Sequence, residues 1–93
     1  MKQSDEWKKE QRERLGLRIR SLREAAGMNQ VQLADLAGIQ SSHLSRIEAG
    51  KYAVTLETIQ AIAEALGMTV DIVDTRLADL TPMKTLTSTA DVR

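Results

Sequence analysis

The sequence contains no cysteine, one proline, two aromatic residues and no long apolar run. Without cysteine, the chain can form neither a disulfide framework nor a thiolate metal site, so a reducing compartment is permitted. No apolar run approaches the roughly 20 residues that a membrane helix needs. The densely charged first 14 residues also lack the apolar stretch of a signal peptide. We therefore expect a soluble intracellular protein with no membrane partner.

An excess of one charge sign is missing as well, because 13 basic and 13 acidic residues give a net charge of zero. The signs are unevenly distributed: residues 1–52 hold ten Lys and Arg against seven Asp and Glu, and residues 53–93 hold three against six. A basic face on the first half is therefore compatible with a neutral total. Taken alone, these charges are explained more simply as a solvated helix surface, so charge does not assign a partner.

Patterns that carry catalysis are absent from the sequence. It has no glycine-rich phosphate loop, no ligand cluster of His, Cys, Asp and Glu, and no nucleophile elbow. The single histidine, His43, has no second His or Cys with which to form a metal or catalytic site. Asp71 and Asp74 are an isolated pair that a solvated chain segment explains. A chain of 93 residues leaves little room for a ligand pocket, and we expect no enzyme activity, cofactor or metal.

Helix signals closed by glycines are what the sequence does contain. The first helix ends at Gly27 and has a charged helical extension, residues 1–14, that frays at its start; its apolar stripe is formed by Leu15, Ile19, Leu22 and Ala26. Asn29 and Gln32 have the spacing of a capping box that opens the next helix. The last helix lies between a Thr55 cap and Gly67, and its predicted buried stripe is Leu56, Ile59, Ile62, Ala63 and Leu66.

Residues 30–50 indicate two short helices joined by one tight turn. Ala34 provides the small contact that two closely crossing helices need, and Gly38 provides the positive φ of the sharp turn. On the second of these helices, Leu44 and Ile47 share the face that points back at the first. The opposite face carries polar side chains that can enter a groove of DNA, namely Ser41, Ser42, Ser45 and Arg46. This arrangement is typical of a helix-turn-helix DNA-binding motif.

The segment 68–73 is ambiguous from its sequence. Its β-branched residues favour a strand, whereas a Thr69 cap would open a fifth helix that buries Val70 and Val73. A lone strand has no partner in a helical domain, so it would pair with its copy in a second chain and form a dimer interface. The predicted interface residues are Met68, Val70 and Ile72. The polar residues 74–93 are predicted to form a flexible tail.

An ordered set of short segments links the chain to a known family: LGLRIRSLR at 15–23, GMNQ at 27–30, QLA at 32–34, AGI at 37–39, LSRIEAGK at 44–51 and ALG at 65–67. With these segments, the chain resembles the Cro/repressor-type (XRE) helix-turn-helix family over residues 15–73. The resemblance implies an all-α, lambda repressor-like bundle of four or five helices. It also implies a bacterial or phage-encoded cytoplasmic protein.

The resemblance implies roles for individual residues. Gln30 matches a position that meets a DNA phosphate, and Lys51, after the Gly50 turn, is a natural phosphate anchor. Arg46 matches a position facing the major groove, where Arg can bind guanine in a bidentate manner. Arg23 and Glu48 are placed to form an ion pair that ties the first helix to the third. The other candidates for DNA contact are Gln40, Ser41, Ser42, His43 and Ser45.

Two departures from the family pattern affect the site. Gln40 stands where the family most often has a Ser or Thr cap, so the helix start shifts or the Gln side chain turns toward DNA. The loop 52–55 lacks the common proline, so its conformation is expected to differ. Tyr52 in this loop is either solvated or adds a hydroxyl contact to DNA.

These observations favour a sequence-specific regulator of transcription that binds double-stranded DNA as a homodimer. We expect a repressor at an inverted-repeat operator with half-site centres about 10 base pairs apart. One alternative is an antitoxin similar to the HipB-like proteins, which represses its own operon and binds a toxin; the segment 68–73 and the polar tail favour it. An alternative of another class is a protein-interaction module that has lost DNA binding, in which the 41–46 face would be idle.

Overall fold

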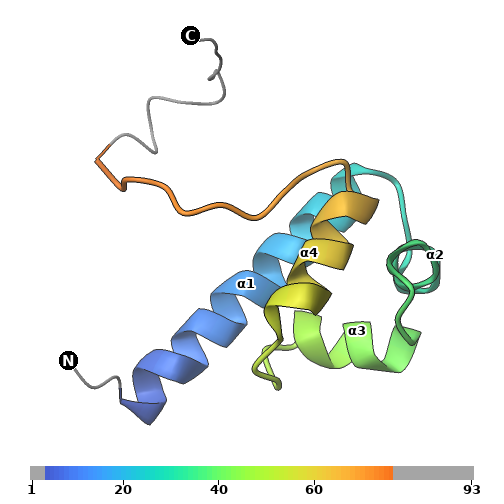
Figure 1. Cartoon of the computed structure of the whole chain (residues 1–93). Coiled ribbons are helices and arrows are strands. Elements are labelled where there is room, and N and C mark those ends of the chain that lie inside the picture. Colours follow the sequence, from blue (N-terminus) through green and yellow to red (C-terminus); the bar gives the residue numbers. More distant parts are fainter. Residues whose placement is uncertain (1–3, 77–93) are drawn as a thin grey trace, which may run out of the picture.

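The computed structural model describes residues 4–76, which form four α-helices and no strand. Helix α1 spans Asp5–Ala25, α2 spans Gln30–Ala37, α3 spans Ser41–Glu48 and α4 spans Leu56–Ala65. α1 packs against α3, and α2 packs against both α3 and α4. Figure 1 shows α3 beneath α4 and to the right of the long helix α1, with α2 at the right edge of the molecule. The prediction of an all-α bundle of four helices is confirmed.

Side-chain caps explain where three of the helices begin. The Ser4 hydroxyl accepts a hydrogen bond from the Trp7 N–H at 3.0 Å, which fixes the start of α1. Asn29 and Gln32 exchange two 2.8 Å hydrogen bonds at the start of α2, so the predicted capping box forms. Thr55 accepts from the Thr58 N–H at 3.2 Å at the start of α4. Each bond satisfies an N–H group that has no partner inside its helix.

The hydrophobic core lies where the four helices meet, and every helix contributes to it. Its buried apolar residues are Ile19 from α1, Leu33 and Ala34 from α2, Leu44 and Ile47 from α3, and Ile62 from α4. Because α3 supplies two of the largest fully buried side chains, its inner face is fixed by the core. Within residues 4–76, no helix combines the length and the apolar character that a bilayer span requires.

Two residues of the predicted apolar stripes are exposed. Ala26 lies outside α1 as its C-cap, with its N–H bonded back to carbonyl groups of the last turn. Leu56 is the first residue of α4 and is 66% exposed, whereas Ile62 of the same stripe is 1% exposed. Both misplaced residues stand at helix ends, where the chain leaves the core. Helical spacing identifies the buried face of a helix but not the length of that face in contact with the core.

The segment after α4 forms neither helix nor strand up to residue 76. The fifth-helix alternative for residues 69–73 is therefore wrong for this chain. The segment is held at its start by Gln60, whose amide oxygen accepts from the Val70 N–H at 3.2 Å. Ile72 beyond it is 97% exposed, so no apolar surface of residues 4–76 covers its side chain. The prediction of a flexible tail at 74–93 lies mostly outside the described residues.

Candidate nucleic-acid interface

The turn between α2 and α3 sets the crossing of the two helices. Gly38 ends α2 with φ of 74°, a left-handed conformation that a residue with a Cβ adopts only under strain. The next N–H, of Ile39, donates to the Ala34 carbonyl at 2.9 Å and closes the turn. Ala34 itself is 1% exposed and belongs to the buried core together with Leu44 and Ile47 of α3. The inner face of α3 is thereby directed into the core.

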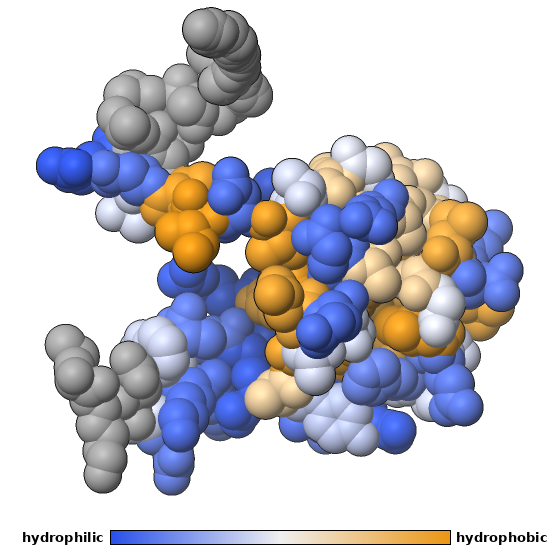
Figure 2. All heavy atoms as spheres, viewed as in Figure 1, coloured by the Kyte–Doolittle hydropathy of each residue, from blue (hydrophilic) through white to orange (hydrophobic). Residues whose placement is uncertain are grey.

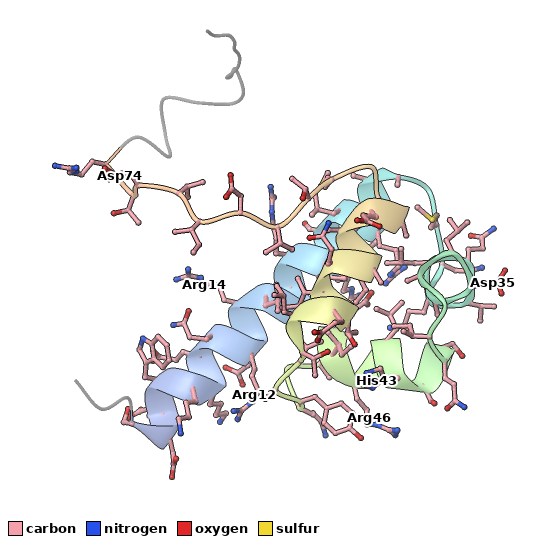
Figure 3. All side chains as sticks on the ribbon, viewed as in Figure 1. Arg12, Arg14, Asp35, His43, Arg46 and Asp74 are labelled. Atoms are coloured by element: carbon pink, nitrogen blue, oxygen red, sulfur yellow. The ribbon has the colours of Figure 1, made fainter. Side chains whose placement is uncertain are left out.

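The outer face of α3 is polar and open to solvent. Its exposed residues are Gln40, Ser41, Ser42, Ser45 and Arg46, while His43 is half-buried beside them. Gln40 is the N-cap residue of α3 in an extended conformation, and its side chain makes no capping hydrogen bond. The helix therefore starts at Ser41 without a side-chain cap, and the Gln40 amide is left for another partner. Figure 3 shows His43 and Arg46 together on the lower side of the molecule.

A buried ion pair ties α3 to α1. The Arg23 Nε donates to Glu48 Oε2 at 2.7 Å, and the second terminal nitrogen donates to Glu48 Oε1 at 3.0 Å. The Arg23 side chain is 9% exposed and that of Glu48 is 3% exposed. A third hydrogen bond runs from Arg23 to the Met28 carbonyl at 2.8 Å, after the end of α1. Hydrogen bonding to Glu48 raises the pKa of Arg23 above its ordinary value, so the guanidinium stays charged.

Gln30 joins this ion pair. Its amide nitrogen donates to Glu48 Oε1 at 3.0 Å, and the side chain is half-buried at the start of α2. An amide NH₂ group has a second hydrogen to donate, so this contact leaves Gln30 able to bind a phosphate. This contact could not be predicted from local spacing, because 18 residues separate Gln30 from Glu48. The Arg23–Glu48 pair therefore orients the Gln30 side chain, which is a candidate for contact with a DNA phosphate.

Two glycines allow the backbone of α1 to pack closely against the C-terminal end of α3. A Cβ at Gly16 would lie 2.5 Å from the carbonyl oxygens of Ile47 and Glu48. A Cβ at Gly50 would lie 2.8 Å from the Glu13 side chain, and Gly50 also has φ of 75°. Arg12 adds a 3.4 Å hydrogen bond from its Nε to the Gly50 carbonyl. The close approach of α3 to Gly16 was not predicted from the sequence.

The loop after α3 places an aromatic ring against the outer face of that helix. The Arg46 guanidinium carbon lies 5.3 Å from the centre of the Tyr52 ring. The His43 ring lies 5.3 Å from the same ring, at an angle of 49°. Lys51, beside Tyr52, is exposed. Tyr52 thus contacts both His43 and Arg46, two candidates for DNA contact. From the sequence, Tyr52 was expected to contribute at most a hydroxyl contact.

The predicted dimer residues lie away from α3. Met68 and Val70 are 45% and 39% exposed, and with Ile72 they form an apolar run along the segment after α4. Met68 and Val70 also line a cavity of about 130 Å³ together with apolar residues of α1 and α4, among them Leu22, Ile59 and Ala63. Figure 2 shows apolar atoms on this segment and on the facing part of the bundle. Over residues 4–76, no three His, Cys, Asp or Glu side chains converge as a metal site would require.

The fold and the exposed polar face of α3 are those of a helix-turn-helix domain. The chain belongs to the helix-turn-helix family, whose sequence profile matches residues 19–73. The immunity repressor protein of Bacillus phage phi105 is 41% identical over 56 residues, which make up 60% of this chain and 39% of the repressor. The chain spans less than half the length of the curated relatives that it matches.

Solved structures with the same fold agree with this assignment. The restriction-modification controller protein C.AhdI from Aeromonas hydrophila is 36% identical with a TM-score of 0.62, and the match covers 63% of this chain and 89% of that one. The clp gene regulator ClgR from Corynebacterium glutamicum is 33% identical with a TM-score of 0.60, over 62% of each chain. The resemblance to the Cro/repressor-type family is therefore confirmed.

Proposed function

We propose that this chain is a transcriptional repressor that binds an inverted-repeat operator as a homodimer in the cytoplasm of a bacterium or a phage-infected cell. It acts by occupying DNA and has no catalytic activity. The observation that carries the proposal is the contrast between the two faces of α3: the inner face is fixed by the core and by Glu48, and the outer face is polar and exposed. An immunity repressor, a restriction-modification controller protein and a clp gene regulator among its relatives support the same function.

In this proposal the outer face of α3 enters the major groove. Arg46 binds a guanine through its O6 and N7 acceptors, and this contact contributes about 1–3 kcal/mol of discrimination against other bases. Four neighbours complete the base contacts: Gln40, Ser41, Ser42 and Ser45. Gln30 and Lys51 bind phosphates on either side of the groove, and His43 lies at the edge of the contact surface.

The dimer in this proposal forms along the segment after α4. Met68, Val70 and Ile72 pair with the same residues of a second chain, and this pairing removes their apolar side chains from water. Leu56, 66% exposed, and Val70 line one more cavity on α4 and extend the apolar surface. A two-fold axis through this segment places two α3 helices in successive major grooves, about 10 base pairs apart.

Selection of binding sites from random DNA with the purified protein tests the proposal. We expect an inverted repeat, and we expect Arg46→Ala to relax the preference at one base pair in each half-site. Arg14→Ala is the matched control, because it removes the same charge from a position that Figure 3 shows on the side of α1 away from Arg46. Binding to random DNA should weaken with salt, with a log–log slope of about 0.9 per phosphate contact.

Two outcomes would contradict the proposal. If the protein does not bind DNA at low salt, the interaction-module alternative replaces it. If Arg46→Ala has the same base preference as the unmodified protein, Arg46 does not recognise a base. The antitoxin alternative rests on residues 68–93 and stays a prediction, which co-purification with the product of a neighbouring gene would test.

A further inference from the structure

Tyr52 makes contacts that the proposed DNA interface does not use. It follows the Gly50 turn in the loop between α3 and α4, and this turn is held by two 3.0 Å hydrogen bonds, from Gly50 N–H to the Ile47 carbonyl and from Lys51 N–H to the Arg46 carbonyl. The backbone before Tyr52 is therefore anchored to the last turn of α3. A ring that is presented in this way has a defined position relative to the outer face of that helix.

The ring of Tyr52 contacts two residues one helical turn apart. His43 and Arg46 are three positions apart on α3, so their side chains lie on the same face. Each lies 5.3 Å from Tyr52, His43 measured between ring centres and Arg46 from its guanidinium carbon to the ring centre. Tyr52 is 39% exposed and also lines a cavity of about 210 Å³ with Ile47, Val54 and Ile59. The ring thus borders a cavity of the domain and also contacts His43 and Arg46.

Stacking and base recognition use different parts of an arginine. A guanidinium group contacts an aromatic ring with its flat face, and it donates hydrogen bonds from its edge. An Arg46 held against Tyr52 therefore keeps the donors that a bidentate contact with guanine needs. Arg46 is otherwise a long exposed side chain with many rotamers, and restricting them before binding reduces the entropy lost on complex formation.

We infer that Tyr52 is a positioning residue for base recognition: its ring, supported by His43, holds the Arg46 guanidinium in the direction from which it reads the major groove. The inference rests on the proposed function, because it gives Arg46 a base to read. Tyr52 acts through Arg46 and needs no contact with DNA of its own. Its loss lowers the preference for the base pair that Arg46 reads and leaves the salt dependence of binding unchanged.

Two substitutions separate the ring from the hydroxyl. Tyr52→Leu keeps an apolar side chain at the cavity that Ile47 and Ile59 also line but removes the aromatic face, whereas Tyr52→Phe keeps the face and removes only the hydroxyl. We expect Tyr52→Leu to lose about two- to fivefold of the preference for the selected site over a site changed at the Arg46 base pair. Tyr52→Phe should stay close to the unmodified protein in this ratio. Tyr52→Met is a second apolar replacement if Tyr52→Leu does not fold.

A double-mutant cycle with Arg46→Ala tests whether the effect runs through Arg46. In the Arg46→Ala background, Tyr52→Leu should cause no further loss of preference at that base pair. A loss of the same size in both backgrounds would overturn the inference, and so would an unchanged preference in Tyr52→Leu alone. If Tyr52→Phe loses as much preference as Tyr52→Leu, the hydroxyl and not the ring carries the effect, and the positioning role is wrong. Failure of the unmodified protein to prefer any sequence would instead refute the proposed function.

Discussion

Gly16→Ala tests how closely α1 packs against α3. Gly16 lies in the middle of α1 and is buried against the end of α3. The added methyl group would lie 2.5 Å from the carbonyl oxygens of Ile47 and Glu48, and these are backbone atoms that no rotamer change can move. The helices must separate by roughly 0.9 Å to bring these atoms to ordinary contact at 3.4 Å.

The magnitude follows from two opposing effects. Replacing Gly by Ala inside a helix normally stabilises it by about 1 kcal/mol. Inserting a methyl group into a closely packed interface costs about 1–3 kcal/mol, and a backbone clash lies at the upper end of this range. We therefore expect the free energy of unfolding to fall by about 1–2 kcal/mol. For a domain of this size, this corresponds to a melting temperature lower by about 4–16 °C.

Thermal unfolding followed by circular dichroism measures the change, at one protein concentration because the proposed dimerisation would make the melting temperature depend on concentration. Ser21→Ala is the matched control, since it adds helix propensity at an exposed position of the same helix and should raise the stability by at most about 0.5 kcal/mol. Gly16→Ala should also weaken DNA binding, because the displaced end of α3 carries Arg46. A melting temperature of Gly16→Ala at or above that of the unmodified protein would refute the backbone approach.

Two further predictions concern the ion pair and the dimer. Glu48→Ala leaves the Arg23 charge buried without its carboxylate partner and should lower the free energy of unfolding by about 3–5 kcal/mol in a urea titration. The double variant Arg23→Met, Glu48→Leu should recover most of this loss, and a loss below about 1 kcal/mol in Glu48→Ala would contradict the argument. Ile72→Asp should shift the chain toward monomer in sedimentation equilibrium without changing the helix content, because Ile72 is 97% exposed in the single chain. Leu36→Asp, at another exposed apolar position, is the control, and an unchanged mass of Ile72→Asp would reject the proposed interface.

Local signals in the sequence were sufficient for most of the fold. The capping box at Asn29 and Gln32 forms as predicted, because both partners lie within one helical turn. Gly38 ends α2 in the left-handed conformation that the turn requires. Leu44 and Ile47 are buried, at 0% and 2% exposure, because helical spacing places both on one side of α3. Short-range spacing carries this information without knowledge of the rest of the molecule.

Contacts between distant residues could not be predicted in the same way. Gly16 inside a helix indicates only a local weakness until the end of α3 is placed against it. The hydrogen bond from Gln30 to Glu48 and the contact of Tyr52 with Arg46 depend on the path of two loops. Leu56 was misassigned to the core because the pattern does not show where the core ends. These features depend on tertiary geometry, which the periodicity of one sequence does not determine.

The two faces of α3 should therefore respond differently to substitution. The inner face is held by the core, by the close approach at Gly16 and by the Arg23–Glu48 pair, so changes there move the whole helix. In the proposed complex, a moved helix would lose all of its DNA contacts together, which would lower the affinity for all sequences along with the stability. The outer face carries Arg46, which Tyr52 contacts, so changes there should affect the proposed reading of one base pair while the fold stays intact. Comparing the loss of affinity with the loss of preference thus distinguishes a residue that holds α3 from one that reads DNA.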